Sequence, residues 1–527
     1  MIYSQLTPPQ PDLARPAHPQ QRLMNNLSLA SLWLGVVVRV VQYLSNRSLW
    51  FDEVAVVLNL QSRNYAELLN ALDYNQAAPP LFLWIEEFSL NTLGNNEYAL
   101  RLYPLLGGLL SLVLFYRLTR AYATGWARPI AMFLFSVMSY IAYYASEVKP
   151  YSWDLALGLL LFSAIARLAT FKPKPQQLAS VGLLGAVSIW LSFPSILVMA
   201  GVEATNLLKL KVWKASVLEL RSLLTRRLPL YAVWLASLVG LYVVNISKTL
   251  SSTDLSTNWV DRYPSSWFDV LWLLDSLGQF FHKPLGFLSP ADGLSIVAFL
   301  IGFGYLYRAQ GWRLAYLCSP FVVTILASYL HKYPFRNRLI VFLTPYALVI
   351  VAEGIALLLR RWRKGPRAMG LLSLSLALLL LLQPLGQTLA WVVKPERSHF
   401  DDVRPAMEYV NQHWQPGDKL YVFRWAKLQF DYYQPRFSFA PDDVFHQTGD
   451  PDLFNVDDPE LQLLAQDVSQ LQTTTLEENA EKTSRVWFLL ARKNEDAAER
   501  LSAELDTLGE SVDRVYYPDV VVSLLAL

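Results

Sequence analysis

Residues 27–53 read LSLASLWLGVVVRVVQYLSNRSLWFDE, and this stretch predicts a protein that is built in a membrane. Residues 27–45 are apolar except for Arg39, and a run of about 20 apolar residues is long enough to cross a bilayer as a helix. Two aromatic residues that suit the membrane interface follow, and then come Asp52 and Glu53. Burying a carboxylate there costs desolvation energy, so we expect this acidic pair to face water or to serve chemistry.

Apolar runs of similar length recur along the chain, which is 53% hydrophobic with 17 Trp, 27 Tyr and 26 Phe and is too apolar for an ordinary soluble protein. We expect about eleven spans. Their ranges are 27–46, 99–118, 128–146, 152–170, 178–193, 194–208, 229–247, 293–308, 314–330, 338–359 and 368–392. The single cysteine, Cys318, lies within one of them, so we expect a buried thiol and neither a disulfide framework nor a cysteine-rich metal site.

The net charge of +2 hides an asymmetry between the two ends of the chain. Residues 396–527 carry 12 Lys and Arg against 25 Asp and Glu, whereas residues 1–395 carry 33 against 18. We therefore expect a transmembrane domain at 27–395 and a small soluble α/β domain at 396–527. Residues 1–26 are rich in Pro and Gln, which predicts a disordered cytoplasmic segment, and we expect the first span to be retained as an anchor.

The basic loops predict how these spans are oriented. If the N-terminus lies in the cytoplasm, alternate loops fall on the cytoplasmic side, and each of them carries Lys or Arg, in agreement with the positive-inside rule. The odd number of spans then places residues 396–527 outside, which is an N-in, C-out topology. Without a cleavable signal or an organelle address, we expect a multi-pass protein of a bacterial plasma (inner) membrane, with its polar outer loops facing the periplasm or the outside.

Two outer loops are too long to be simple connections. Residues 53–71 have the periodicity of an amphipathic helix that lies on the membrane, and Pro79-Pro80 end this region. Residues 81–92 are apolar but too short for a span, so we expect an interfacial or re-entrant helix there. The loop at 248–292 begins polar and becomes aromatic, as a lid or a surface helix would.

In the soluble domain we predict helices at 401–414 and 494–508 and strands at 419–424, 485–491, 512–517 and 520–526. That domain contains no glycine-rich phosphate loop and no zinc-ligand spacing in its sequence.

The unusual polar side chains of the membrane domain all fall on the outer side in this topology. They are Asp52, Glu53, Tyr74, Asn75, Gln76, Arg101, Glu147, Lys149, Tyr151, His282, Lys283 and the stretch 331–338 (HKYPFRNR). A carboxylate can accept the proton of an attacking hydroxyl, and arginines can clamp phosphate oxygens and stabilise a leaving group. The set therefore favours a site that handles a hydroxyl nucleophile and a phosphate leaving group.

Five motifs, taken in order, resemble the GT-C superfamily of polytopic glycosyltransferases (family 39-like), in the branch of the protein O-mannosyltransferases and the aminoarabinose transferases that modify lipid A. The motifs are Trp50-Phe51-Asp52-Glu53, Ala78-Pro79-Pro80-Leu81, Leu100-Arg101-Leu102-Tyr103-Pro104, Glu147-Val148-Lys149-Pro150-Tyr151 and 333–339 (YPFRNRL). The resemblance covers roughly residues 28–395. Ala78 stands where many relatives have His, which removes one potential metal ligand, and Lys149 stands where Arg is usual, which weakens bidentate binding there.

The resemblance implies a transferase that moves a sugar from a polyprenyl-phosphate-linked donor to a hydroxyl acceptor on the extracytoplasmic face, with inversion. The acceptor would be a glycolipid, a polysaccharide or a protein; no nucleic acid is implied, and no cofactor is assigned, although a divalent metal stays open. Asp52 would be the catalytic base, and Glu53 would orient the acceptor or support the helix of Asp52. Contacts to the donor and its lipid phosphate would come from Arg101, Glu147, Lys149, Tyr151, His331, Lys332, Arg336 and Arg338.

Each of these roles has a structural alternative. Asp52 would equally serve as the N-cap of helix 53–71, and Glu53 would meet the positive end of the helix dipole. The two late arginines would reach toward lipid headgroups, and Glu147 with Lys149 would form an ordinary ion pair in a loop. His282 and His331 lack the spacing of metal ligands.

Two rival functions also remain at this point. The first is a multi-span transporter or lipid flippase, and the second is a non-catalytic scaffold that presents the acidic tail. Transporters more often place polar groups at mid-membrane, on broken helices in paired halves. This sequence shows neither a repeat nor a matched pair of broken spans, and Arg39 is its exception to polar groups in loops.

Overall fold

The computed structural model of the chain describes residues 19–250, 262–364, 367–447, 485–491, 503, 505–507 and 509–526. Its α-helices are α1 (Pro19–Leu44), α2 (Phe51–Ser62), α3 (Pro80–Leu93), α4 (Glu97–Tyr122), α5 (Ala127–Val137), α6 (Ser139–Tyr143), α7 (Tyr151–Ala166), α8 (Pro175–Leu191), α9 (Ser195–Lys209), α10 (Val217–Leu241), α11 (Ser247–Leu250), α13 (Val270–His282), α14 (Ala291–Tyr329), α15 (Thr344–Lys364), α16 (Arg367–Val393), α17 (Val403–His413) and α18 (Lys427–Tyr433). Shorter helical turns are η2 (Glu67–Leu69), η3 (Tyr144–Ser146), η4 (Val212–Lys214), η5 (Tyr242–Ile246), η7 (Asn337–Leu343), η8 (Pro395–Ser398), η9 (Gln434–Arg436) and η10 (Pro441–Asp443).

Six helical segments of the described residues are long and apolar enough to cross a bilayer. They are α1, α4, residues 217–250, α14, residues 337–360 and α16. A seventh span results if α5 and residues 139–146, which meet at a bend of 58°, are counted as one. Each predicted range overlaps described helices, but 128–146 crosses the bend between α5 and α6, two ranges share α14, and α7, α8 and α9 are shorter than the six. The number eleven therefore stays a prediction.

The first helix begins earlier than predicted. Because α1 starts at Pro19, the prediction of disorder is wrong for residues 19–26, while residues 1–18 lie outside the described part. The amphipathic helix predicted over 53–71 is also shorter, since α2 ends at Ser62. Asn64 starts a separate turn there, because its Oδ1 accepts hydrogen bonds from the backbone N–H groups of the second and third residues that follow.

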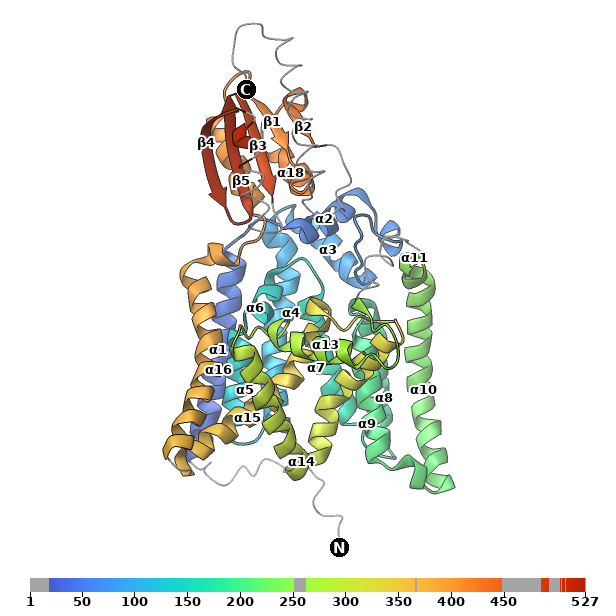
Figure 1. Cartoon of the computed structure of the whole chain (residues 1–527). Coiled ribbons are helices and arrows are strands. Elements are labelled where there is room, and N and C mark those ends of the chain that lie inside the picture. The colour runs from blue at the N-terminus through green and yellow to red at the C-terminus, as the bar shows by residue number, and fades with distance from the viewer. Residues whose placement is uncertain are drawn as a thin grey trace.

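α14 and α15 approach each other closely at two glycines. The backbone of α14 leaves helical geometry at Gln310 (φ −152°, ψ 54°), so α14 consists of two limbs that form a V in Figure 1. At Gly302 and Gly354 an added Cβ atom would overlap the backbone of the facing helix. Glycine at these two positions therefore allows the close backbone approach that is common between membrane helices.

A five-stranded sheet forms the C-terminal part of the described chain. Its strands are β1 (Lys419–Val422), β2 (Val444–His446), β3 (Arg485–Ala491), β4 (Glu510–Tyr517) and β5 (Val520–Ala526). Their order is β2-β1-β3-β5-β4, with β1 parallel to β2 and β3, and with β5 antiparallel to β3 and β4. The predicted helix 494–508 lies largely outside the described residues. The boundary at residue 396 and the solubility of this part stay predictions.

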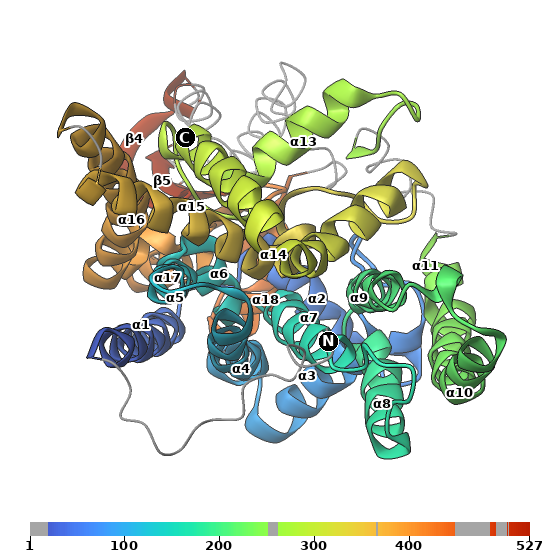
Figure 2. The same cartoon turned by 90° about the horizontal axis from the view of Figure 1, so that it is seen from below.

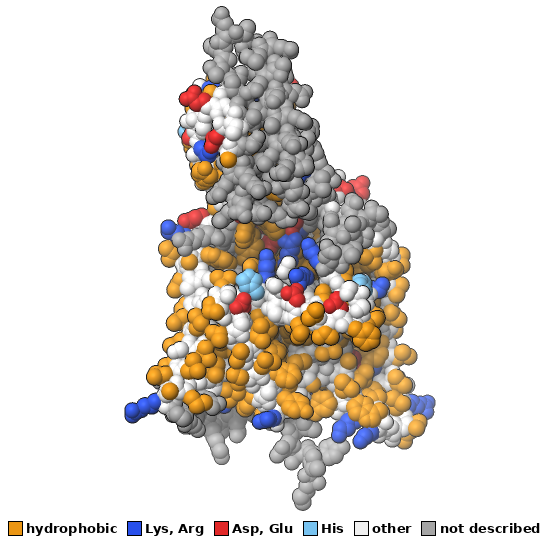
Figure 3. Space-filling view, viewed as in Figure 1, with side chains coloured by type: hydrophobic (Ala, Val, Ile, Leu, Met, Phe, Trp, Pro, Cys, Tyr) orange, Lys and Arg blue, Asp and Glu red, His pale blue; other side chains and the backbone are white. Residues whose placement is uncertain are grey.

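The elements are layered along one axis. The sheet stands at one end of the helix bundle, and α2 and α3 lie across that end between the bundle and the sheet (Figure 1). In the bundle, α1 and α16 lie on one side and α8, α9 and α10 on the other, with α7 between them (Figures 1 and 2). Apolar side chains cover the visible face of the bundle, and Lys and Arg side chains gather at the end away from the sheet (Figure 3).

Candidate active site

Asp52 lies in the first turn of α2, in the layer between the bundle and the sheet. The N-cap of α2 is Trp50, so the alternative that Asp52 is the N-cap is wrong. The Asp52 carboxylate, 15% exposed, contacts the guanidinium of Arg338 and is hydrogen-bonded to the side chain of Gln76. Arg338 stands at the start of η7, 286 residues further along the chain. The fold thus brings the predicted base to one of the predicted phosphate-binding arginines.

Aromatic rings frame the guanidinium of Arg338. Its central carbon lies 5.3 Å from the ring centre of Trp50 and 5.8 Å from that of Tyr151, which are cation–π distances. Glu147 accepts a hydrogen bond from Nε1 of Trp50 at 3.1 Å. The other oxygen, Oε2, is buried and has no hydrogen-bond partner among the described residues. Glu147 and Tyr151, two predicted donor contacts, therefore lie beside Trp50 and Arg338.

Lys149 joins this group through Gln76. Its Nζ donates to Oε1 of Gln76, whose side chain is also hydrogen-bonded to Asp52. Sequence reasoning placed Gln76 among the outer polar residues but gave it no role, because it belongs to no motif. We call Asp52, Gln76, Glu147, Lys149 and Arg338 the Asp52 cluster.

The charges of the Asp52 cluster act on one another and shift its pKa values. Burial raises the pKa of Asp52, but the positive charges of Arg338 and Lys149 outweigh this effect and hold the pKa below its usual value. Burial lowers the pKa of Lys149 to about 8 and raises that of Glu147 to about 7. At neutral pH Asp52 and Lys149 are therefore charged.

Glu53 points into the protein instead of toward the Asp52 cluster, and it is fully buried. Arg101 holds it with two hydrogen bonds, from Nε to Oε1 at 2.9 Å and from Nη2 to Oε2 at 2.6 Å, and the backbone N–H of Val148 adds a third at 2.9 Å. Arg101 also donates to the backbone carbonyls of Arg47 (2.6 Å) and Ser48 (2.9 Å). Because its guanidinium binds both Glu53 and these carbonyls, Arg101 stabilises the chain that precedes α2.

The late basic stretch divides into an inner and an outer part. His331 and Lys332 are exposed. Nη1 of Arg336 donates to the carboxylate of Asp275 on α13 at 2.8 Å, and both side chains are partly exposed. Only Arg338 among the four predicted basic residues contacts Asp52 in this structure.

Two further cations near Arg338 were given no role in the site from the sequence. Lys283 follows α13, and its pKa is lowered by burial and by the charge of Arg338. The pKa of Arg262 is lowered by burial and by the charges of Arg338 and Arg336. Lys283 stood among the outer polar residues of the sequence, but no motif marks Arg262. Figure 3 shows Lys and Arg side chains gathered in a hollow between the apolar band and the sheet.

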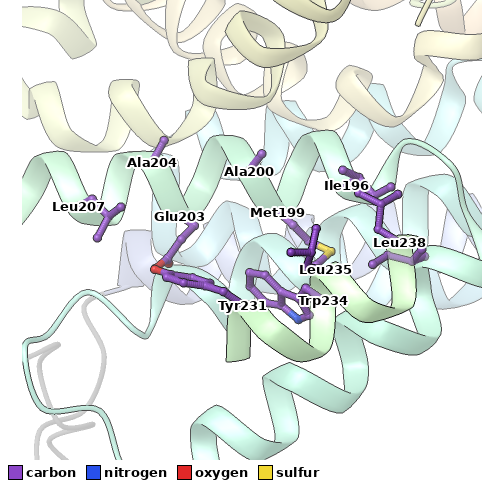
Figure 4. A pocket seen from close by; sticks show the side chains of 11 residues that line it. Ile196, Met199, Ala200, Glu203, Ala204, Leu207, Tyr231, Trp234, Leu235 and Leu238 are labelled. Carbon is purple, nitrogen blue, oxygen red and sulfur yellow. The ribbon is translucent and has the colours of Figure 1, made fainter. Parts of the chain in front are cut away.

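A second buried carboxylate lies on α9, within the bundle. Glu203 contacts Arg227 of α10 and accepts hydrogen bonds from the Tyr231 hydroxyl at 2.5 Å and from Nδ2 of Asn206 at 2.8 Å. We call these four residues the Glu203 cluster. It borders a cavity of about 380 Å³ whose other lining side chains, from α8, α9 and α10, are apolar (Figure 4).

The metal question was left open by the sequence. Across the residues that the structure describes, no group of three or more His, Cys, Asp and Glu side chains is arranged to hold a metal ion. His282 lies 3.7 Å from the carboxylate of Asp292, and His331 is exposed. A divalent metal is therefore not assigned to any residue here.

The chain is similar to one family model and to several solved structures. Residues 77–244 match the family model described as dolichyl-phosphate-mannose-protein mannosyltransferase. Among solved structures, ArnT from Cupriavidus metallidurans bound to undecaprenyl phosphate shares 13% identity over 93% of this chain and 97% of that chain, with a TM-score of 0.45. The Archaeoglobus fulgidus oligosaccharyltransferase shares 12% identity over 77% of this chain, with a TM-score of 0.42, and this chain spans 63% of its length. No curated protein matches the chain.

The similarity to the two solved structures is too low to carry an argument, and the family model matches less than half of the chain. The matched range contains three of the five motifs on which the resemblance rests, including Arg101 and the stretch from Glu147 to Tyr151. The match supports, over this range, the resemblance predicted from the sequence to membrane glycosyltransferases of the GT-C superfamily.

Proposed function

We propose that this protein is a membrane glycosyltransferase that moves a sugar from a polyprenyl-phosphate donor to an acceptor hydroxyl on the extracytoplasmic face of a bacterial inner membrane, with inversion. The observation that carries the proposal is the contact between the Asp52 carboxylate and the Arg338 guanidinium, with Lys149 beside them. A base for a hydroxyl and cations for a phosphate are thereby in one place. The name of the matched family, which contains a dolichyl-phosphate sugar, supports the donor class.

The proposed reaction needs one base and one cation group. The acceptor oxygen attacks the anomeric carbon, the bond from that carbon to the phosphate oxygen breaks, and the hydroxyl proton passes to Asp52. Arg338 and Lys149 neutralise the charge that develops on the departing lipid phosphate. A single displacement of this kind inverts the anomeric configuration.

The contact between Asp52 and Arg338 also suggests an order of binding. Without donor, Arg338 is engaged by Asp52, and this pairing holds the pKa of the carboxylate low, which makes Asp52 a weak base. A donor phosphate would compete for Arg338 and release Asp52, whose pKa would then rise. The base would thus become effective only when the leaving group is in place.

The remaining predicted residues take places around this centre. Glu147 and Tyr151 would line the donor pocket, and Glu53 with Arg101 would position α2, which departs from the phosphate contact predicted for Arg101. The surface positions of His331, Lys332 and Arg336 suit the rim, where the donor headgroup would enter from the bilayer.

The proposed sidedness rests on charge. Lys and Arg side chains gather at the end of the bundle away from the Asp52 cluster (Figure 3), which is the pattern of a cytoplasmic surface. Residues 396–527 would then lie outside the cell membrane, as predicted. No observation favours the transporter, flippase or scaffold alternatives.

Donor turnover by the purified protein tests the proposal. A panel of polyprenyl-phosphate sugars is offered in detergent, and release of polyprenyl phosphate is measured for the parent and for Asp52→Asn. We expect release by the parent with at least one donor and a fall on the order of 10²–10⁴-fold in Asp52→Asn, which keeps the shape but loses the base. Asp506→Asn, which alters an exposed ion pair with Arg514 at the sheet, is the matched control and should turn over normally.

A further inference from the structure

The chain between α1 and α2 is held by residues near the C-terminal sheet. We call residues 45–50 the entry segment, because it leads into the helix that carries Asp52. The Asp402 carboxylate accepts a hydrogen bond from the backbone N–H of Ser48 at 3.3 Å and contacts the Ser48 hydroxyl, although the two residues are 354 positions apart. Arg404 donates from Nη2 to the carbonyl of Asn46 at 2.5 Å. Asp402, just before α17, and Arg404, in the first turn of α17, thus fix two backbone groups of the entry segment.

α18 adds a further contact to the entry segment. The hydroxyl of Tyr433 accepts a hydrogen bond from the backbone N–H of Leu49 at 2.8 Å and donates to Oε1 of Glu97 at 2.9 Å. Arg404 and Arg436 also bind Glu97, at 2.8 Å and 3.1 Å. Glu97 is buried, so the two cations and the hydroxyl satisfy a carboxylate that water does not reach.

The same network extends to Arg101, which binds Glu53. Glu97 and Arg101 stand one turn apart in α4, and Arg101 donates to the carbonyls of Arg47 and Ser48. The entry segment is therefore held both by hydrogen bonds from α4 and by hydrogen bonds from residues 402–436. Both sets of hydrogen bonds lie within a few residues of Asp52.

Apolar packing continues this connection. One core contains Leu49 of the entry segment and Val54 of α2 together with Met407 of α17, Phe430 of α18 and Trp487 of β3, all of them buried. One face of the sheet and α2 therefore share a core. A displacement of α17 or α18 would be transmitted to α2, because close-packed side chains leave no room for independent movement.

We infer that Arg404, Asp402 and Tyr433 are positioning residues for catalysis, because they hold the entry segment and thereby fix where the Asp52 carboxylate lies. The C-terminal part is then a component of the catalytic apparatus. Since catalysis requires the base within a fraction of an ångström of its productive place, loosening the entry segment lowers turnover more than it lowers donor binding. The inference rests on the proposed function for its kinetic effect, but not for its structural effect.

The first test measures hydrogen exchange at residues 46–53 in the full-length protein. Arg404→Ala removes the contacts to Asn46 and Glu97, so we expect faster exchange across this segment than in the parent. Lys427→Ala is the matched control, because Lys427 forms a partly exposed ion pair with Asp431, which also lies on α18 and outside the entry segment. Unchanged exchange in Arg404→Ala would overturn the inference, and this readout needs no donor.

The second test measures kinetics with the donor that the parent uses. In Arg404→Ala we expect kcat to fall about tenfold or more while the donor KM stays within about twofold. Arg404→Lys should recover only part of this loss, because its single amine replaces a guanidinium that binds Asn46 and Glu97 through two different nitrogens. Lys427→Ala should keep the kcat of the parent. If Arg404→Ala fails to fold, Tyr433→Phe, which removes one hydroxyl, replaces it in both tests. A parent without turnover contradicts the proposed function alone, whereas an active parent with a normal Arg404→Ala contradicts this inference.

Discussion

The Asp52 cluster and the Glu203 cluster each bury a carboxylate against an arginine, but they treat the charges differently. In the Glu203 cluster both carboxylate oxygens accept hydrogen bonds, and the cavity beside it is apolar. In the Asp52 cluster Lys149 and Arg338 act together on Asp52, and an oxygen of Glu147 has no partner among the described residues. The difference teaches that a buried ion pair alone marks packing, whereas crowded cations beside an unsatisfied acceptor mark a site.

The largest expected effect separates the two arginines of these clusters. Arg338→Ala should lower donor turnover on the order of 10²–10³-fold, because the leaving phosphate loses its main counter-charge. Arg227→Ala should instead cost about 3–5 kcal/mol of stability, because it leaves the Glu203 carboxylate buried without its cation. Turnover and thermal unfolding are measured on both variants. A loss of turnover in folded Arg227→Ala would contradict the distinction between a catalytic Arg338 and a structural Arg227.

A second prediction concerns the neighbouring acids Asp52 and Glu53. Glu53→Gln should lower stability by about 3–5 kcal/mol, since Arg101 then keeps a buried charge without its carboxylate. Asp52→Asn should cost less stability than Glu53→Gln, because Asp52 and Arg338 are partly exposed whereas Glu53 and Arg101 are buried. Differential scanning fluorimetry measures both, and an Asp52→Asn protein as unstable as Glu53→Gln would give Asp52 a structural role.

A third prediction uses pH. The pKa of Lys149 is about 8, so its positive charge is present below that pH and is lost as the pH rises through it. Turnover should therefore decline above about pH 8, by a few-fold per unit, and Lys149→Arg should move the decline to higher pH because arginine stays charged. An unchanged alkaline limb in Lys149→Arg would show that another group sets it.

The smallest expected effect belongs to the rim. Arg336→Ala breaks a partly exposed ion pair with Asp275, which is worth about 0–1 kcal/mol. We expect the donor KM to rise about two- to fivefold with kcat nearly unchanged, because Arg336 would contact the entering headgroup and not the reacting atoms. A fall in kcat as large as that of Arg338→Ala would mean that the two arginines share one role.

The order of the motifs and their common side were predictable from the sequence, and the inward turn of the late basic stretch was not. Arg336 has an extended backbone, and Asn337 adopts φ +47°, so the chain turns between the two arginines and sends them to different partners. No local pattern reveals such a turn. Likewise, the hydrogen bond between Ser48 and Asp402 joins residues 354 positions apart, and only the folded chain brings them together.

Glu53 shows a related limit. Its place beside Asp52 in the sequence suggested a shared site, but successive helical residues point about 100° apart, so one faces Arg338 and the other faces Arg101. The partner of Glu53 lies on another helix, 48 residues away. Adjacent acids on a helix therefore require the fold before either is given a role.

The most direct test of the account is the affinity of undecaprenyl phosphate for the parent and for Asp52→Asn. If Asp52 occupies Arg338 until a lipid phosphate arrives, removing the carboxylate charge frees Arg338, so Asp52→Asn should bind the lipid phosphate several-fold more tightly while its turnover is lost. Equal or weaker binding by Asp52→Asn would contradict the claim that the base and the phosphate compete for one arginine.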